Sequence, residues 1–204
     1  PELMQKMYDD RVKFKQLMIE AQKDYEKTKD PKLQKTIAKF NNIQMAKKIS
    51  LNSAYGAIGN VWFRYYNLLV AEAITTSGQL AIRYIEHTLN QYLNKILDTR
   101  GEDYIIASDT DSVYITFDNL VSKVFVSDTD DNKIVEFLDR VAKEKLEPFI
   151  DKSYQDLAEY VNAYEQKMQM KREVIADKGI WTAKKRYILN AHDVEGVRYK
   201  EPQL

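Results

Sequence analysis

The stretch YIIASDTDSVYITF, residues 104–117, contains two β-prone runs on either side of a polar tip. Isoleucine, valine, tyrosine and phenylalanine dominate the runs, and these residue types favour extended strands. The tip, Ser108–Ser112, consists of residue types that are common in turns. The stretch therefore predicts a β-hairpin with a polar turn, which places the fold outside the purely helical classes.

Helical patterns surround this hairpin in the sequence. Apolar residues recur at helical spacing from about Leu69 to Leu97, and this is the most apolar of the expected helices. Residues 133–163 carry an amphipathic helical pattern, and short strands are predicted at Glu173–Ala176 and Arg186–Asn190. We expect a small antiparallel sheet packed on helices.

Two further long helices are predicted at the start of the sequence, from residue 3 to about 28 and from about Lys32 to Tyr55. Asp30-Pro31 separates them, because the residue before a proline resists the helical conformation. A short connection between two long helices predicts an antiparallel hairpin. The expected fold is therefore α+β, with a long helical hairpin that projects from the sheet and its helices.

The composition limits the possible chemistry. The 204 residues include no cysteine and two histidines, so disulfides and thiolate metal sites are excluded. Any metal would be a hard, oxygen-ligated cation such as Mg²⁺ or Mn²⁺. No window approaches the roughly 18 consecutive apolar residues of a membrane span. We expect a cytoplasmic protein without a membrane partner.

Charge is segregated along the chain, although the 31 basic and 31 acidic residues cancel. Residues 98–159 carry 16 acidic and 7 basic side chains, whereas residues 1–48 carry 12 basic and 7 acidic ones. Residues 160–204 carry 9 basic and 6 acidic side chains, so two basic regions flank an acidic one. This pattern suits a protein that binds phosphate while it holds a metal. Solvated helix faces explain much of the same pattern.

The polar tip places two carboxylates, those of Asp109 and Asp111, within one small volume. Carboxylates this close repel each other unless a divalent cation neutralises them, and metal-assisted phosphoryl transfer requires such an arrangement. A plain turn is the alternative, because aspartate and serine are common turn residues.

A second acidic segment resembles a calcium loop, with Asp128, Asp130 and Asn132 at positions 1, 3 and 5. Position 6, where such a loop needs glycine, is Lys133, and position 12 is Asp139 instead of the usual glutamate. The segment is therefore interpreted as a solvated acidic loop.

Polar and cationic residues share helix faces in the predicted helical hairpin. Lys48, Asn52 and Tyr55 are spaced i, i+4 and i+7, and Arg11 and Lys15 are spaced i and i+4. A cation, an amide and an aromatic ring are suited to contact a phosphate, a sugar and a base, respectively. Lysine-rich solvated helices are the alternative.

A compact cationic cluster, Lys184, Lys185, Arg186 and Tyr187, is expected at the start of a strand. Alternation along a strand would send Lys185 and Tyr187 to one face, and Lys184 and Arg186 to the other. Such a cluster can hold a nucleic-acid backbone, where charge supplies affinity without sequence choice.

Together these segments resemble the family B DNA polymerases, most closely their bacteriophage branch. KKISLNSAYG at 47–56 is similar to the fingers motif, SDTDS at 108–112 to the palm aspartate motif, and KKRY at 184–187 to the primer-holding motif. The resemblance implies that residues 1–59 are the fingers hairpin and 60–204 a partial palm. It also implies primer-template DNA and deoxynucleoside triphosphates as partners, with host cytoplasm as the location if a phage encodes the chain.

The resemblance assigns roles to individual residues. Asp111 would be a direct metal ligand, Asp109 an associated carboxylate of lesser importance, and Glu173 an accessory carboxylate near the metals. The Lys184–Tyr187 cluster would grip the primer end.

In the fingers, the resemblance implies that Arg11, Lys15 and Lys48 contact the triphosphate of the incoming nucleotide. Asn52 would lie beside the triphosphate, and Tyr55 would lie against the nascent base pair.

Two departures from the family pattern matter. Ala107-Ser108 replaces the usual tyrosine-glycine before the palm aspartates, and the upstream palm motif, which supplies another metal-bridging aspartate, does not occur in these residues. We therefore expect no polymerase activity from this chain alone. The missing exonuclease, upstream palm and thumb segments would be partners in cis or, in a split polymerase, in trans. A non-catalytic nucleic-acid-binding or helical scaffold module is the alternative.

Overall fold

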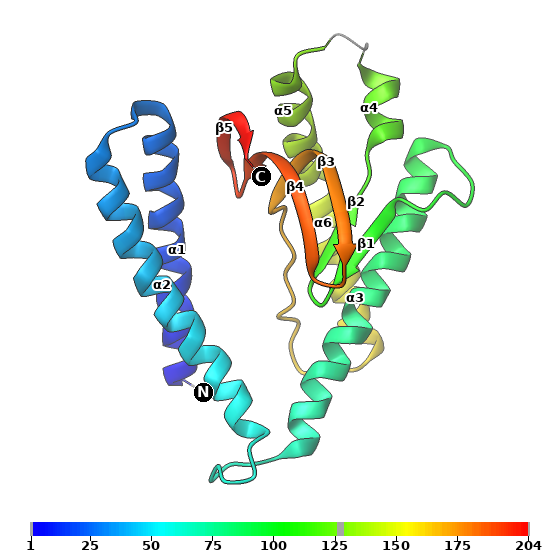
Figure 1. The fold of residues 1–204 in the computed structure, drawn as a ribbon. Coiled ribbons are helices and arrows are strands. Elements are labelled where there is room, and N and C mark those ends of the chain that lie inside the picture. Colours follow the sequence, from blue (N-terminus) through cyan, green and yellow to red (C-terminus); the bar gives the residue numbers. More distant parts are fainter. Residues whose placement is uncertain (1, 126–128, 204) are drawn as a thin grey trace. The chain divides into compact units, whose positions relative to one another are not determined.

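The computed structural model describes residues 2–125 and 129–203. It has the expected α+β class, with two small antiparallel sheets, β1–β2 and β3–β4–β5 (Figure 1). In chain order the elements are α1 (Glu2–Thr28), α2 (Pro31–Ile58), α3 (Leu68–Leu97), β1 (Ile105–Asp109), β2 (Ser112–Ile115), α4 (Asp118–Val124), α5 (Asp131–Val141), the π-helical turn η1 (Ala142–Leu146), α6 (Glu147–Tyr160), β3 (Val174–Ala183), β4 (Arg186–Val194) and β5 (Val197–Gln203).

The chain divides into two compact units. The first comprises Pro1–Ile74, Ala176–Lys178 and Leu189–Leu204, and the second comprises Thr75–Ile175 and Gly179–Ile188. These units describe packing, and the assignment of 1–59 to fingers and 60–204 to palm stays a prediction.

In the first unit, α1 and α2 form the predicted antiparallel hairpin. Asp30 caps α2 by accepting a hydrogen bond from the Lys32 amide at 2.9 Å, and Pro31 occupies the first turn, where no amide donor is needed. Further along, Phe14 packs on Phe40 with 6.1 Å between ring centroids. The break at Asp30-Pro31 is thus confirmed, together with the pairing of the two helices.

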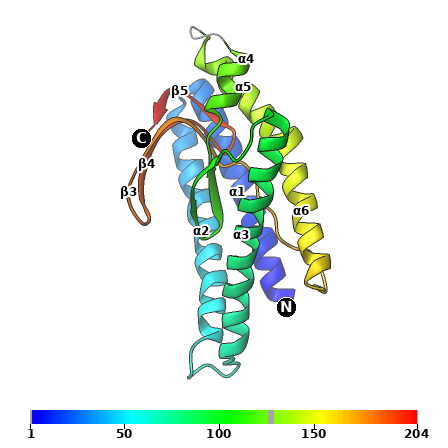
Figure 2. The same cartoon turned by 90° about the vertical axis from the view of Figure 1, so that its right-hand side faces the viewer.

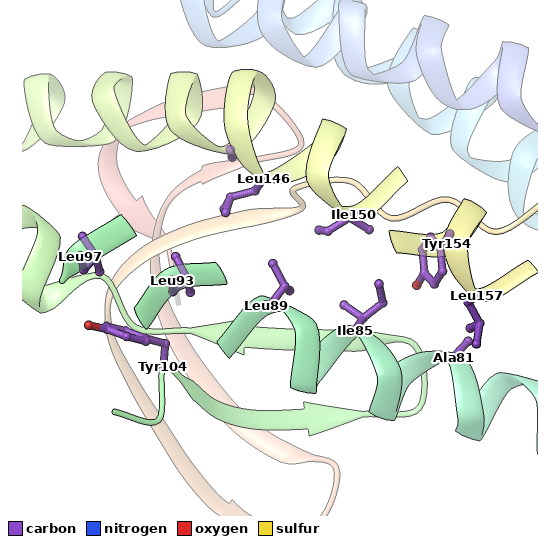
Figure 3. Packing of buried hydrophobic residues seen from close by; sticks show 11 residues of the cluster. Ala81, Ile85, Leu89, Leu93, Leu97, Tyr104, Leu146, Ile150, Tyr154 and Leu157 are labelled. Atoms are coloured by element: carbon purple, nitrogen blue, oxygen red, sulfur yellow. The ribbon is translucent and has the colours of Figure 1, made fainter. Parts of the chain in front are cut away.

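In the second unit, α3 supplies one side of the hydrophobic core (Figure 3). Its buried residues recur every four positions and face a second stripe on η1 and α6. The first stripe is Ala81, Ile85, Leu89, Leu93 and Leu97, and the second is Leu146, Ile150, Tyr154 and Leu157.

The end of α3 fixes the β1–β2 hairpin in place. The side-chain oxygen of Asn90 accepts the Tyr104 amide at 2.8 Å, and the Thr116 amide donates to the Tyr104 carbonyl at 2.9 Å. Tyr104 is almost completely buried, and its hydroxyl lies 2.8 Å from that of Thr99. The strands that carry the polar tip are therefore anchored to the core on both sides.

The helical pattern over 133–163 is wrong in one respect, because the structure divides it. A π-helical turn at Ala142–Leu146 separates α5 from α6, and the amide of Glu147 donates to the carbonyl of Ala142. Pro148 follows at once and has no amide to continue the regular ladder, which accounts for the widened turn. The structure also contains α4, which no sequence pattern indicated.

The acidic segment before α5 serves as a helix cap. Asp130 accepts the Asn132 amide at 3.2 Å and so uses its carboxylate on the start of α5. Asp128, the remaining member of the calcium-loop pattern, lies outside the described residues.

Truncation of a buried core side chain should lower the stability of the protein. Leu89 is 0% exposed, so we expect Leu89→Ala to lower the free energy of unfolding by about 2–5 kcal/mol through lost contacts and a residual cavity. Urea unfolding monitored by circular dichroism measures this. Ile96→Ala, at a 55% exposed position of the same helix, is the matched control and should change stability by less than about 1 kcal/mol.

Candidate active site

The turn between β1 and β2 carries the two aspartates at its tip. Asp109 pairs with Ser112 as the last strand pair, and Thr110 and Asp111 form the turn. The Asp111 amide donates to the Asp109 carbonyl at 2.6 Å, and Thr110 has φ 56°. A left-handed conformation is rare for a β-branched residue, and such strain clusters at functional sites.

The two carboxylates differ in their surroundings. Asp109 is half-buried and accepts a hydrogen bond from the Thr110 hydroxyl at 3.0 Å, whereas Asp111 is exposed. The Ser112 hydroxyl donates to the Asp109 carbonyl at 3.1 Å and closes the turn. Two hard oxygen donors on one rigid turn suit Mg²⁺ or Mn²⁺, which take carboxylate ligands and need others to complete their shell.

Three aromatic rings join this hairpin to the β3–β4 hairpin. Tyr114 on β2 meets Trp181 on β3 and Tyr187 on β4, each edge to face with 5.3 Å between centroids. Trp181 and Tyr187 are stacked at 6.4 Å. Figures 1 and 2 both show the turns of the two hairpins at the same end. This aromatic cluster therefore holds the aspartate turn and the basic β3–β4 turn together within the second unit.

The pKa of Tyr114 is raised from 10.0 to about 12. Burial is the main cause, followed by the hydrogen bond with Tyr187, and the charge of Asp109 adds to the effect. Ser112 opposes it. The phenol of Tyr114 is consequently neutral next to the aspartate turn over the whole physiological range.

This shift predicts a measurable pH dependence. Between about pH 10 and 12 the folded protein keeps the Tyr114 proton that the unfolded chain has lost, so the free energy of unfolding falls with rising pH. The contribution is fully present below pH 10 and is lost as the pH rises through about 12. Urea unfolding at increasing pH should show a steeper loss of stability for the wild-type protein than for Tyr114→Phe.

Tyr154 and Tyr199 also have raised pKa values, but they are present in both proteins and cancel in this comparison. Identical pH profiles of wild type and Tyr114→Phe would contradict the burial of the Tyr114 phenol in the aromatic cluster.

The basic cluster is placed differently from the prediction. Lys184 and Lys185 form the two-residue turn between β3 and β4, with Lys185 at φ 62°, and β4 starts only at Arg186. The predicted alternation of Lys184 and Arg186 against Lys185 and Tyr187 is therefore wrong, because the first two residues belong to a turn. All four side chains are exposed, and the strands around them are longer than expected.

Glu173 lies immediately before β3 and is exposed. Its neighbour Arg172 is held by an ion pair with Asp139 and by a 3.1 Å hydrogen bond from its amide to Glu147. In residues 2–125 and 129–203, no three histidine, aspartate or glutamate side chains gather as a metal-binding group. Glu173 is thus not assembled with Asp109 and Asp111 here, and its metal role remains a prediction.

The predicted nucleotide-binding residues of α2 lie in the first unit. Lys48 and Asn52 are exposed, and the Tyr55 hydroxyl donates to the Ala71 carbonyl at 3.3 Å. The neighbouring Lys47 is the one that pairs with α1, through a 2.7 Å contact with Asp10. Lys47 therefore stabilises the helical hairpin, which leaves Lys48 to face solvent.

The structure places the two residues of the predicted pair on α1, Arg11 and Lys15, in different surroundings. Lys15 forms an ion pair with Glu195, which lies between β4 and β5. The Nε atom of Arg11 is buried without a hydrogen-bond partner among the described residues. Glu195, Tyr114 and Trp181 are the side chains at these sites that spacing rules missed, because long-range contacts alone bring them there.

No helix within the described ranges is both long enough and apolar enough to cross a membrane.

The sequence was compared with known proteins and matches one family over most of its length. The family model for DNA polymerase family B matches residues 1–198. The chain is 48% identical over 170 residues to the DNA-directed DNA polymerase of Escherichia phage RB69, and 46% identical over 173 residues to that of Enterobacteria phage T4. These matches cover 79% and 80% of the chain but 19% of each relative. The chain thus spans about a fifth of the length of these relatives.

Proposed function

The chain belongs to DNA polymerase family B, and we propose that it forms the fingers and part of the palm of a DNA-directed DNA polymerase. The reaction is attack of a primer 3′-hydroxyl on the α-phosphate of a deoxynucleoside triphosphate, with release of pyrophosphate. Primer-template DNA is the second substrate. Because both relatives are phage proteins, the proposed location is the cytoplasm of an infected host.

One observation carries this proposal: the aspartate turn and the basic β3–β4 turn are held together by Tyr114, Trp181 and Tyr187. Phosphoryl transfer to a nucleic-acid end needs carboxylates for a metal and cations for a phosphate backbone. The two kinds of group occur here on neighbouring hairpins of one unit. Solvated surface charge does not require such an aromatic connection.

In the proposed site, Asp111 and Asp109 would hold the divalent cation, with Glu173 as an accessory carboxylate. The bound cation supplies charge neutralisation and activates the hydroxyl nucleophile. Lys184 and Lys185 of the β3–β4 turn, together with Arg186 and Tyr187 at the start of β4, hold the primer backbone.

The fingers residues bind the incoming deoxynucleoside triphosphate. Arg11, Lys15 and Lys48 neutralise the triphosphate, and Asn52 lies beside it. Tyr55 lies against the nascent base pair, so that base pairing chooses the nucleotide and the protein checks its shape. Closure of the fingers would bring these residues to the reacting phosphate.

The remaining parts of the site come from outside these residues. The relatives extend over about five times the matched length, and the upstream aspartate motif does not occur in this sequence. We expect the 204-residue chain alone to give no primer extension with Mg²⁺, because the metal-bridging aspartate of the upstream palm is absent; exonuclease, upstream palm and thumb segments are the proposed partners in cis or in trans. Extension by the purified chain alone would contradict this expectation.

Manganese binding tests the proposed function against a scaffold role. Paramagnetic Mn²⁺ should broaden the NMR signals of Thr110 and Ser112, and Asp111→Ala should abolish the broadening. Asp118→Ala, at an exposed acidic position just beyond β2, is the control and should leave it unchanged. Equal broadening in wild type and Asp111→Ala would favour a non-catalytic module.

A further inference from the structure

Lys15 is already paired before any nucleotide is present. It lies on α1, and its ammonium group forms an ion pair with Glu195, in the turn between β4 and β5. Both side chains are largely shielded, at 32% and 24% exposure. The two residues belong to the same compact unit although 180 positions separate them in the sequence.

The conformation of the turn that carries Glu195 is stabilised by its own backbone geometry and hydrogen bonds. Glu195 has φ 51° and Gly196 has φ 82°, as in the two-residue hairpin turns with two left-handed residues. The Gly196 amide donates to Asp193 at 2.9 Å, and Asp193 is buried beside Arg198, with 3.4 Å from the carboxylate to Nε. These bonds do not involve Lys15, so the turn is organised independently of it.

Glutamate is an unusual residue at this position. Left-handed turn positions favour glycine, asparagine or aspartate, and a longer side chain there costs conformational energy. Such a conformation persists where the surrounding structure maintains it, and it is concentrated at functional sites. The Glu195 side chain is used in the ion pair with Lys15.

The turn also lies close against α1. A Cβ atom at Gly196 would come within 3.2 Å of the Lys23 ammonium, so a larger residue would push against this side chain. Val197, the next residue, is 2% exposed. The β4–β5 turn is therefore packed on the part of α1 that carries Lys15 and Lys23.

We propose that Glu195 is a positioning residue that holds Lys15 until the triphosphate of a nucleotide replaces it, an inference that rests on the proposed function of Lys15. One ammonium group carries one positive charge, and a carboxylate and a phosphate compete for it. Glu195 therefore raises the nucleotide concentration that the polymerase needs.

Glu195→Gln tests this in the polymerase that contains the chain. Glutamine keeps the size and turn geometry of glutamate but removes the charge. We expect the nucleotide KM to fall by about two- to fivefold, the range of a partly exposed ion pair, and kcat to stay within about twofold. Glu201→Gln makes the same charge change at an exposed position of β5 and should leave KM unchanged.

A double-mutant cycle separates this inference from the proposed function. If Glu195 acts through Lys15, Glu195→Gln should lower KM in the wild-type background and have no effect beside Lys15→Ala. An unchanged or raised KM for Glu195→Gln, together with a raised KM for Lys15→Ala, would overturn the inference and leave the nucleotide role of Lys15 intact. No effect of Lys15→Ala would overturn both.

Binding of inorganic tripolyphosphate gives a readout without turnover. Calorimetric titration of the polymerase should show about two- to fivefold tighter binding for Glu195→Gln than for wild type. Equal affinities would contradict competition between the carboxylate and phosphate.

Discussion

Asp111→Asn is expected to lower kcat for primer extension by about 10³-fold or more in the polymerase that contains this chain. Asparagine keeps the size of the side chain but removes the charge that would bind a divalent cation. The turn should survive, because its hydrogen bonds come from the Asp111 amide and from Thr110 and Ser112. Single-nucleotide incorporation measured by rapid quench gives kcat and KM separately.

Two further variants show whether the loss of kcat is specific to Asp111. Asp109→Asn should cost less than Asp111→Asn, because we propose Asp109 only as an associated carboxylate of lesser importance, and because it is half-buried in the turn. Asp118→Asn, at an exposed acidic position just beyond β2, should leave kcat within about twofold of wild type. A wild-type kcat in the Asp111→Asn enzyme would contradict a role of Asp111 in the chemical step.

Lys48→Ala should lower kcat/KM for nucleotide incorporation by about 10²-fold, the scale of losing one charged group that stabilises developing phosphate charge. Lys48 is exposed on α2, on the same helix face as Asn52 and Tyr55. It is therefore available to a triphosphate without breaking a contact within the protein. Steady-state incorporation over a range of nucleotide concentrations measures the loss.

The adjacent lysine is a matched control. Lys47 has the same charge and lies on the same helix, but it pairs with Asp10 at 2.7 Å and links α2 to α1. Lys47→Ala should lower the free energy of unfolding by about 1 kcal/mol or less and change kcat/KM by only a few fold. Equal kinetic losses for both variants would indicate that the hairpin's overall charge, not Lys48, binds the nucleotide.

Local rules were sufficient for the elements that carry the site. The break at Asp30-Pro31 followed from proline geometry, and the β1–β2 hairpin followed from two β-prone runs around a polar tip. Both depend on neighbours in the sequence. The α+β class and the helical hairpin are confirmed for the same reason, because long periodic segments determine them.

Contacts between distant segments could not be predicted in this way. The π-helical turn at Ala142–Leu146 arises inside a continuous amphipathic pattern. Lys184-Lys185 was predicted at the start of a strand, and the pairing of β3 with β4 makes these residues the turn instead. Likewise, Tyr114 gains Trp181, and Lys15 gains Glu195, only through folding. Periodicity places a side chain on a face but does not identify what that face meets.

A chimera tests the central claim most directly. Residues 1–204 would replace the matching segment of the Enterobacteria phage T4 polymerase, and primer extension would be measured on primer-template DNA with each of the four nucleotides. The expected result is incorporation of the complementary nucleotide, lost on Asp111→Asn. A chimera that is folded and binds primer-template DNA but extends no primer would contradict the assignment of this chain to the polymerase active site.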